Sequence, residues 1–399
     1  MSDDPSKYGP ADQQEDFEDL NLSGDWFHGA VLWSTDWTTE TILAQLRRGN
    51  IDLNPRYQRR AAWDQRRKSI FIESLIMGLP IPQIILAEDH NKKGAFIVID
   101  GKQRLLALSQ FAARDADPFD TLALTGLSDR PDLVGKRYID LQSNPDLLGE
   151  LNTFDNQTIR TVVIRNWQDE RYLYSVFLRI NTGSQPLSPQ ELRQAIAPGP
   201  FSDFLDDYAI SSKPLQDALG LTKPDFRMRD NELALRFFAY KNSISDYTGS
   251  LKQFLDRFTI SANRSWDRIA ANLREQADDL DEAILTTREI FGDRRYLRKW
   301  NGENYEPRIN RAVFDVMTYY FSNRTIARAA KSKTTEITDS FMRLCDTNED
   351  FRSALEQTTK SLGANATRFN IWGQELKSIL GEEVVGPIPH LDNNRILVG

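Results

Sequence analysis

The densest group of chemically capable side chains lies at residues 99–104, which read Ile-Asp-Gly-Lys-Gln-Arg. An apolar run precedes this segment and an apolar-periodic run follows it, so the pattern predicts a strand, a tight turn and a helix. The turn would place Lys102, Gln103 and Arg104 at a helix N-terminus, where backbone N–H groups and the helix dipole attract anions. Two cations and an amide at such a place predict a phosphate-binding site.

Asp100 would stand at the end of the strand, beside this turn. A carboxylate there could hold Mg²⁺ or act as a base, so we predict Asp100 as a metal ligand. Asp100, Gln103 and Arg104 form the predicted catalytic set, in which Gln103 would orient a water molecule. A structural interpretation stays open, because Asp100 could instead cap the helix and Arg104 could pair with a surface carboxylate.

Further motifs surround the turn in a fixed order. Residues 54–60 read Asn-Pro-Arg-Tyr-Gln-Arg-Arg, residues 78–82 read Gly-Leu-Pro-Ile-Pro, and residues 181–183 read Asn-Thr-Gly. This ordered set resembles the domain-of-unknown-function family numbered 262, which includes the GmrS half of GmrSD-type, modification-dependent restriction systems. The central motif of that family is Asp-Gly-Gln-Gln-Arg, and Lys102 replaces its first Gln here. The resemblance implies action against foreign or modified DNA, as a nuclease or as a nuclease regulatory subunit.

A more distant resemblance is to the ParB and sulfiredoxin-like fold. Residues 54–60 are similar to its Asn-Pro…Gln-x-Arg segment, and residues 101–104 are similar to its Gly-x-x-Arg phosphate motif. Members of that fold bind a nucleoside triphosphate at the helix that this motif begins. The resemblance implies a nucleoside triphosphate, with Mg²⁺, as the cofactors, but it does not fix the reaction that follows.

These motifs define a predicted nucleotide site. Arg59 and Arg104 would make bidentate phosphate contacts, and Asn181 and Thr182 would close the pocket from the opposite side. Tyr57 could stack on a base or pack in the core, and residues 181–182 could simply shape the turn before a capped helix. The full predicted nucleotide-binding set is Tyr57, Gln58, Arg59, Gly101, Lys102, Arg104, Asn181 and Thr182.

Basic residues gather in three clusters. The first spans residues 56–68, the second mixes cations with Tyr296 and Trp300, and the third spans residues 324–333. Cations beside aromatic rings suit nucleic acid, although core packing explains the rings of the second cluster equally well. We interpret the third cluster as a solvated helix face. The predicted DNA-binding residues are Arg56, Arg60, Arg66, Arg67, Lys68, Arg294, Arg295 and Arg298.

Composition limits the remaining possibilities. Residues 1–25 carry a net charge of −7 out of the total of −8, so the rest of the chain is close to neutral and local patches can bind DNA. The histidines, His28, His90 and His390, lie far apart, which argues against a zinc site and a His-Asn-His nuclease motif. Any nuclease activity would therefore use the N-terminal domain or a separate nuclease subunit. No Walker-type phosphate loop is present.

Cys345 is the only cysteine, so no internal disulfide can form and we expect a cytoplasmic protein. No stretch suits a membrane span, and we expect no membrane partner. A homo-oligomer is compatible with the sequence.

The leading hypothesis is a nucleotide-dependent, DNA-directed defence protein, acting in anti-phage defence or modification-dependent restriction, that binds and hydrolyses a triphosphate. The alternative is a non-catalytic nucleotide or DNA sensor that switches a partner protein.

The elements that must position these residues predict an α+β chain. We expect an acidic tail and aromatic arm at 1–37, a ParB/sulfiredoxin-like domain at 38–200 and a helical domain at 201–399. Strands are predicted at 51–53, 83–86, 95–99, near 123, at 138–141 and at 158–164. N-terminal helices are predicted at 39–48, capped by Thr38 or Thr39, and at 65–78, capped by Asp64. Later helices are predicted at 171–180 and from 188, where Ser188 and Glu191 would form a capping box. The helices expected after residue 200 span 201–218, 229–243, 249–260, 262–291, 305–330, 334–346, 348–362 and 368–380, and residues 384–399 should be extended or loose.

Overall fold

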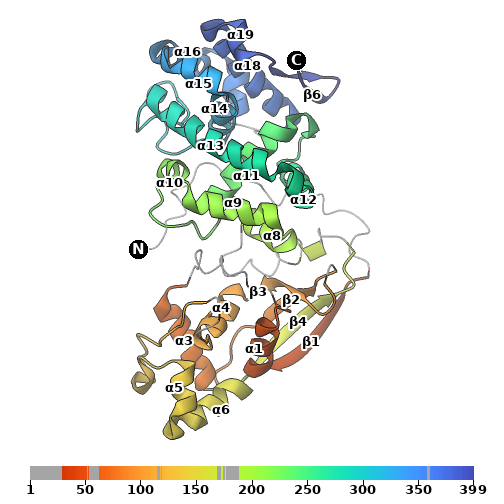
Figure 1. Ribbon diagram of the computed structural model, residues 1–399, viewed down its shortest axis with the longest axis vertical. Coiled ribbons are helices and arrows are strands. Elements are labelled where there is room, and N and C mark those ends of the chain that lie inside the picture. The colour runs from red at the N-terminus through yellow and green to blue at the C-terminus, as the bar shows by residue number, and fades with distance from the viewer. Residues whose placement is uncertain are drawn as a thin grey trace. The chain divides into compact units, whose positions relative to one another are not determined.

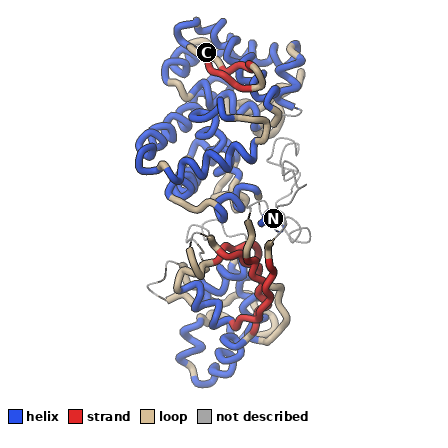
Figure 2. Tube along the Cα trace, turned by 90° about the vertical axis from the view of Figure 1, so that its right-hand side faces the viewer, coloured by secondary structure: helices blue, strands red, loops and turns tan. Residues whose placement is uncertain are grey.

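The computed structural model describes residues 29–51, 53, 63–90, 92–114, 117, 119–168, 172, 173, 176, 188–356 and 360–399. These residues divide between 196 and 197 into an N-terminal unit and a C-terminal unit, drawn in Figure 1. The N-terminal unit combines a small mixed sheet with helices, and the C-terminal unit is mostly helical, as the tube in Figure 2 shows. The α+β prediction is therefore confirmed.

The sheet of the N-terminal unit has the strand order β1-β4-β2-β3. β2 (Ile84–Glu88) and β4 (Thr158–Arg165) run parallel, while β1 (Val31–Thr38) and β3 (Phe96–Asp100) pair antiparallel with their neighbours. β3 lies at an edge of the sheet, and the chain leaves the sheet after its last residue, Asp100.

The described helices that share one apolar core with this sheet include α1 (Thr39–Arg47), α3 (Gln65–Ile76), α4 (Lys102–Phe111) and α6 (Leu148–Asn156). Ile84 and Leu86 of β2 are buried in the same core as side chains from these helices. Two helix starts follow the sequence prediction, because Thr38 accepts a hydrogen bond from Thr41 N at 3.1 Å and Asp64 accepts one from Arg67 N at 2.7 Å. The core thus fixes α4 against α3.

Several predicted strands of the N-terminal unit are wrong. Residues 138–141 form the helix α5 (Tyr138–Ser143), because the Asp140 carboxylate accepts from Arg137 N at 2.7 Å and starts a helical turn. Residues near 123 form a loop, in which Leu124 exchanges backbone hydrogen bonds with the segment 135–136. Of residues 51 and 53, which the structure describes, Ile51 forms an isolated bridge with Phe96.

The segment predicted as an aromatic arm is partly a strand. Residues 31–38 of it form β1, which pairs along its whole length with β4. Val31, Leu32 and Trp33 are nevertheless exposed on this edge strand, and the Arg165 guanidinium lies 4.0 Å from the centroid of the Trp33 ring. The folded N-terminal unit therefore begins before residue 38. Residues 1–28, which hold the acidic tail, lie outside the described residues.

One further helix, α8 (Pro189–Ile196), closes the N-terminal unit. Its predicted capping box is confirmed, because Ser188 N donates to Glu191 Oε2 at 2.7 Å and Glu191 N donates to Ser188 Oγ at 3.1 Å. The predicted helix at 171–180 falls mostly outside the described residues.

The C-terminal unit follows the predicted helical pattern but divides it more finely. Ser212, Asn310 and Asn323 each cap a helix through their side-chain oxygens and so break or shorten the long predicted segments. The helices are α9 (Pro200–Ser211), α10 (Lys213–Leu219), α11 (Arg229–Ser243), α12 (Leu251–Arg264), α13 (Trp266–Phe291), α14 (Arg311–Phe321), α15 (Arg324–Lys331), α16 (Thr334–Thr347), α17 (Glu349–Glu356), α18 (Leu362–Leu380) and α19 (Glu382–Val385).

Residues 389–398 are extended, which is one of the two forms expected for the segment 384–399. β5 (Pro389–Asp392) and β6 (Arg395–Val398) form an antiparallel hairpin after α19. Asn393 and Asn394 join them with φ values of 45° and 61°, which is the conformation that a tight two-residue hairpin requires and that asparagine tolerates. Ile396 of this hairpin is buried in the core of the C-terminal unit.

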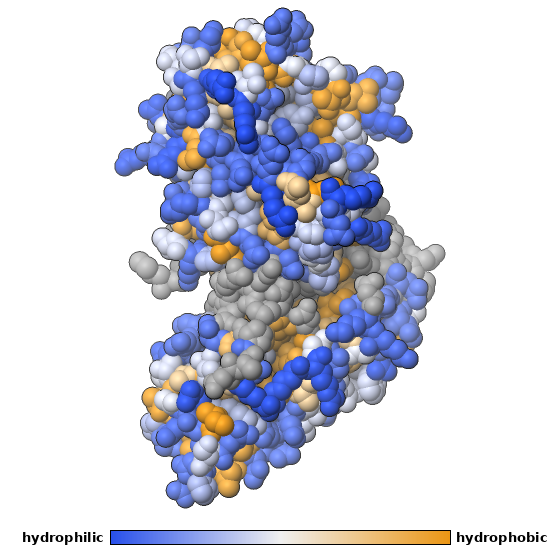
Figure 3. All heavy atoms as spheres, viewed as in Figure 1, coloured by the Kyte–Doolittle hydropathy of each residue, from blue (hydrophilic) through white to orange (hydrophobic). Residues whose placement is uncertain are grey.

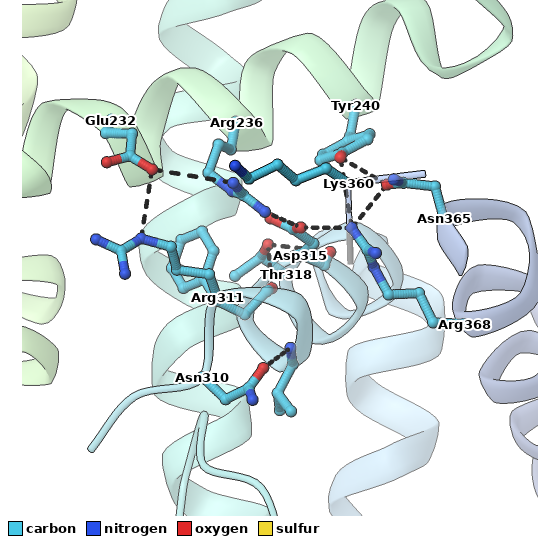
Figure 4. A network of polar contacts seen from close by, with 12 residues as sticks. Glu232, Arg236, Tyr240, Asn310, Arg311, Asp315, Thr318, Lys360, Asn365 and Arg368 are labelled. Carbon is cyan, nitrogen blue, oxygen red and sulfur yellow. Dashed lines mark hydrogen bonds and ion pairs between the residues drawn. The ribbon is translucent and has the colours of Figure 1, made fainter. Parts of the chain in front are cut away.

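A network of buried charges joins three helices of the C-terminal unit (Figure 4). Arg236 of α11 forks onto Asp315 of α14, with Nε–Oδ1 at 2.9 Å, and Arg368 of α18 reaches the same carboxylate at 3.0 Å. All three residues are buried. Glu232 lies between Arg236 and Arg311, and its Oε1 is 3.9 Å and 3.3 Å from their nitrogens. Buried charges persist only when paired, so α11, α14 and α18 are held in register by this network.

The surface of the described residues is mainly hydrophilic on the face that Figure 3 displays. None of the helices in the described ranges combines the length and apolar character that crossing a bilayer requires.

We predict that Asp315→Ala destabilises the C-terminal unit by about 3–5 kcal/mol, because it leaves two buried guanidinium groups without their shared carboxylate. Lys213→Ala is the control: it removes the exposed pair with Asp217 and should cost under about 1 kcal/mol. Hydrogen exchange in α11 and α14 during urea unfolding measures both. Equal effects of the two substitutions would contradict the role given to Asp315.

Candidate functional site

The turn between β3 and α4 forms as the sequence predicts. Asp100 ends the strand, Gly101 turns the chain, and Lys102 begins the helix. Gly101 has φ of +100°, and a Cβ placed on it would lie 3.0 Å from Ile84 Cγ1. Glycine is therefore required both by the backbone conformation and by the close approach of β2. The consequence is an abrupt helix start directly at the end of an edge strand.

The N-terminus of α4 has the form of an anion site. Within the described part of the chain, no side chain caps this helix at Gly101, and its first backbone bond runs from Leu105 N to Gly101 O at 2.9 Å. The N–H groups of the first turn point toward the helix start, where the helix dipole is positive. This geometry fits the sequence prediction of a phosphate site, which stays a prediction.

Asp100 pairs with Arg104 instead of capping the helix. Arg104 Nη2 donates to Asp100 Oδ2 at 2.7 Å, across one turn. The Arg104 side chain is 10% exposed and that of Asp100 is 27% exposed. Of the structural alternatives, capping by Asp100 is not observed, and the carboxylate partner of Arg104 is Asp100 itself. Asp100, the predicted base, and Arg104, the predicted phosphate ligand, thus form one ion pair beside the turn.

Lys102 and Gln103 are half-buried beside this pair. Gln103 Oε1 accepts a hydrogen bond from Trp63 N at 3.3 Å, which connects the turn to the segment just before α3. The Trp63 ring contacts Phe71 edge-on and lies 5.1 Å from the Arg67 guanidinium. The structure therefore brings the turn at Gly101 close to the start of the basic helix α3.

The basic cluster at residues 56–68 is only partly described. Arg66 and Arg67 are exposed at the start of α3, as DNA contacts would need to be. Lys68 is buried. Burial lowers the pKa of its ammonium group, and the nearby carboxylates of Asp120 and Asp64 offset part of that decrease. The buried position of Lys68 removes it from the surface that we assign to DNA. The predicted residues outside the described ranges are Arg56, Tyr57, Gln58, Arg59, Arg60, Asn181 and Thr182.

The second basic cluster divides between surface and core. Arg294 and Arg295 are exposed, and Arg298 is half-buried. Tyr296 is buried, and Lys299 is buried in ion pairs with Glu306 and Glu356. The core interpretation of the ring of Tyr296 is therefore correct. In the third cluster, Arg324 pairs with Asp279 and Lys331 pairs with Glu289 at the surface, as a solvated helix face would.

The residue types at the turn allow a limited chemistry. Among the residues that the structure describes, no group of three His, Cys, Asp or Glu side chains could hold a metal ion. Asp100 alone could supply Mg²⁺ with one carboxylate, and that ion commonly takes its other ligands from phosphate and water. Burial raises the pKa of the Cys345 thiol to about 12, so Cys345 is a core residue and no nucleophile.

Sequence reasoning missed a second group of cations in the C-terminal unit, around Arg229 and Arg311. The available signal was the spacing of acids four residues before arginines, as in Asp225 with Arg229 and Glu232 with Arg236. That spacing predicts surface pairs on a helix, and only the folded unit shows that they are buried beside a cavity.

Comparison with known proteins gives one match. Residues 39–197 match the family model described as GmrSD restriction endonuclease, N-terminal domain. The match covers α1, α3 and the turn at Gly101 and ends next to the boundary between the two units. The searches of curated proteins and of solved structures give no match.

We predict that Gly101→Ala destabilises the N-terminal unit by about 2–4 kcal/mol, because backbone strain at positive φ adds to crowding against Ile84. Gly94→Ala is the matched control, since Gly94 also has positive φ (+80°) but nothing within 4 Å of the added Cβ. The difference between the two urea midpoints measures the crowding. No difference would mean that β2 and the turn do not pack as tightly as described.

Proposed function

We propose that the N-terminal unit, a domain of the GmrSD N-terminal family, makes this chain a DNA-directed defence protein of restriction type that binds and hydrolyses a nucleoside triphosphate. The observation that carries the proposal is the turn at Gly101. It combines an uncapped helix N-terminus among the described residues, a half-buried lysine at the first helical position, and an arginine held by a neighbouring carboxylate.

The proposed phosphate contacts come from three kinds of donor. Backbone N–H groups of the first turn of α4 would bind phosphate oxygens, and Lys102 would add a point charge. Arg104 would contribute through its guanidinium, whose five N–H donors allow it to contact a phosphate while Asp100 keeps it in place. Such donors stabilise the charge that develops on phosphate oxygens during transfer.

Asp100 would have two partners in the loaded state. The residues fit Mg²⁺, because Asp100 offers an oxygen ligand whose side chain is 27% exposed and lies beside the proposed phosphate position. When bound, the ion would neutralise phosphate charge. Asp100 would at the same time orient Arg104, and Gln103, already bonded to Trp63 N, would be placed to position a water molecule.

DNA would contact exposed arginines in each unit. Arg66 and Arg67 lie at the exposed start of α3, and Arg294 and Arg295 lie on the exposed loop after α13. Contacts of this kind bind phosphate groups without reading sequence. We propose that the chain acts on DNA as a nuclease or as the regulatory subunit of one.

A second candidate function is a sensor or adaptor that binds nucleotide or DNA without turnover. The Asp100–Arg104 pair favours it, because the one carboxylate at the turn is already engaged. The two functions differ in one measurement. Mg²⁺-dependent phosphate release by the purified chain, abolished in Asp100→Asn, supports hydrolysis, whereas nucleotide binding without any release supports the sensor.

We predict that Lys102→Ala weakens triphosphate binding about tenfold, because one charge-assisted contact is lost. Lys102 is the clean probe, since replacing the buried Arg104 would leave Asp100 without its partner. Lys93→Ala, in the exposed loop before β3, is the control and should bind as the wild type does. Calorimetric titration measures all three proteins, and equal affinities would remove the turn from the proposed function.

We also predict that Arg66→Glu with Arg67→Glu weakens DNA binding to every sequence and reduces the slope of log K against log salt by about 2. Lys92→Glu with Lys93→Glu is the control, because it makes the same change in net charge in an exposed loop. Fluorescence anisotropy over a salt series measures the slopes. The same loss in both double variants would show a general charge effect and no specific contact.

A further inference from the structure

A cavity of about 650 Å³ opens in the C-terminal unit, beside the start of α11. The end of α10, the loop at 220–228 and the loop that precedes α14 form its walls. Five cationic side chains line it against two carboxylates, those of Asp217 and Asp225. The cations are Lys223, Arg229, Arg298, Arg308 and Arg311.

Carboxylates hold two of these guanidinium groups in place. Arg229 forks onto Asp225, with Nε–Oδ2 at 2.7 Å and Nη2–Oδ1 at 2.9 Å. Burial alone would raise the pKa of Asp225, but the hydrogen bond and charge of Arg229 lower it overall, so the pair is charged. Arg311 is held by Glu232 at 3.3 Å. Figure 4 shows that Glu232 also faces Arg236, so Arg311 joins the buried network.

This arrangement prepares the cavity for an anion. Arg229 and Arg311 are 16% and 11% exposed in their side chains, so each is fixed by a carboxylate yet still reaches the surface of the cavity. The planar fork of a preorganised guanidinium group matches the spacing of two phosphate oxygens and loses little entropy on binding. Exposed Lys223 and half-buried Arg298 add positive charge at the rim.

The remaining walls are apolar. Leu219, Leu221 and Phe226 are half-buried along the cavity, and Ile309 faces it from the loop before α14. Such surfaces suit a planar ring or a sugar, and the volume lies within the range of about 300–1,000 Å³ that small-ligand sites occupy. Cationic and apolar walls in one cavity of this size distinguish a nucleotide site from a flat patch for DNA backbone.

We propose that this cavity binds a nucleoside phosphate, with its phosphate on Arg229 and Arg311 and its base against Leu221 and Phe226. The site lies outside residues 39–197 and does not depend on the turn at Gly101. The shared chemistry is that of one nucleotide, supplied either as a free molecule or as part of a DNA strand.

Hydrogen exchange of the full chain tests the proposal with three probes: inorganic phosphate, dAMP and a twelve-nucleotide single strand. We expect dAMP or the strand to protect residues 220–229 and 305–311, and to do so at a concentration at least fivefold lower than phosphate. Protection by dAMP identifies a free nucleotide, and protection by the strand alone identifies a nucleotide within DNA. Protection by none of the probes at millimolar concentration overturns the proposal, and so does protection by phosphate at a concentration as low as that at which dAMP or the strand protects.

A pair of double variants assigns the effect to the cavity. Lys223→Glu with Arg298→Glu reverses charge at the rim, away from the buried pairs, and should weaken binding at least tenfold. Arg328→Glu with Lys333→Glu makes the same change at exposed positions of the C-terminal unit outside the cavity lining and should leave binding unchanged. Equal weakening in both variants would overturn the proposal. Protection of residues 95–110 is read in the same experiment, so failure at the Gly101 turn is distinguishable from failure here.

Discussion

A guanidinium group leaves water only in the company of a carboxylate, and this constraint organises both units of the protein. In the N-terminal unit it joins Arg104 to Asp100 across the first turn of α4. In the C-terminal unit it places Asp315 between Arg236 and Arg368 and so fixes three helices. The desolvation cost of such pairs is high, and replacing them by apolar residues is often neutral for stability. Their presence is therefore better explained by the positions that they impose than by the energy that they contribute.

At the Gly101 turn, Asp100 holds the guanidinium group of Arg104 beside the N-terminus of α4. Without Asp100, the Arg104 side chain would have many rotamers and would lose entropy on binding an anion. With Asp100, the guanidinium is oriented in advance, but the carboxylate is partly neutralised. The same interaction thus orients a cation at the helix N-terminus and engages an oxygen of the carboxylate that was predicted as a base. This competition is the physical reason why hydrolysis and sensing are both chemically reasonable for this site.

The cavity beside α11 uses the same principle with different geometry. Two of its arginines are held by acids, Arg229 by Asp225 and Arg311 by Glu232, and the Asp225 side chain is only 2% exposed. At the Gly101 turn the backbone supplies donors and the side chains are few. In the cavity the side chains supply the donors, and apolar walls accompany them. The two places therefore differ in how much of a ligand they could contact.

The sequence alone determined the features whose causes lie within a few residues. The strand, glycine and helix around Gly101, the Asp64 and Thr38 caps and the capping box at Ser188 are local, because turn conformation and capping depend on neighbours in the chain. The ordered motifs also sufficed to indicate the family that residues 39–197 match.

Only the tertiary structure decided which charges are buried. Lys68 and Lys299 look like surface cations in the sequence, yet they face the interior, because long-range packing chooses the buried side of a helix or loop. The ion pair of Asp100 with Arg104 spans only four residues and is local, whereas the cavity beside α11 depends on segments brought together by folding, which no short pattern records.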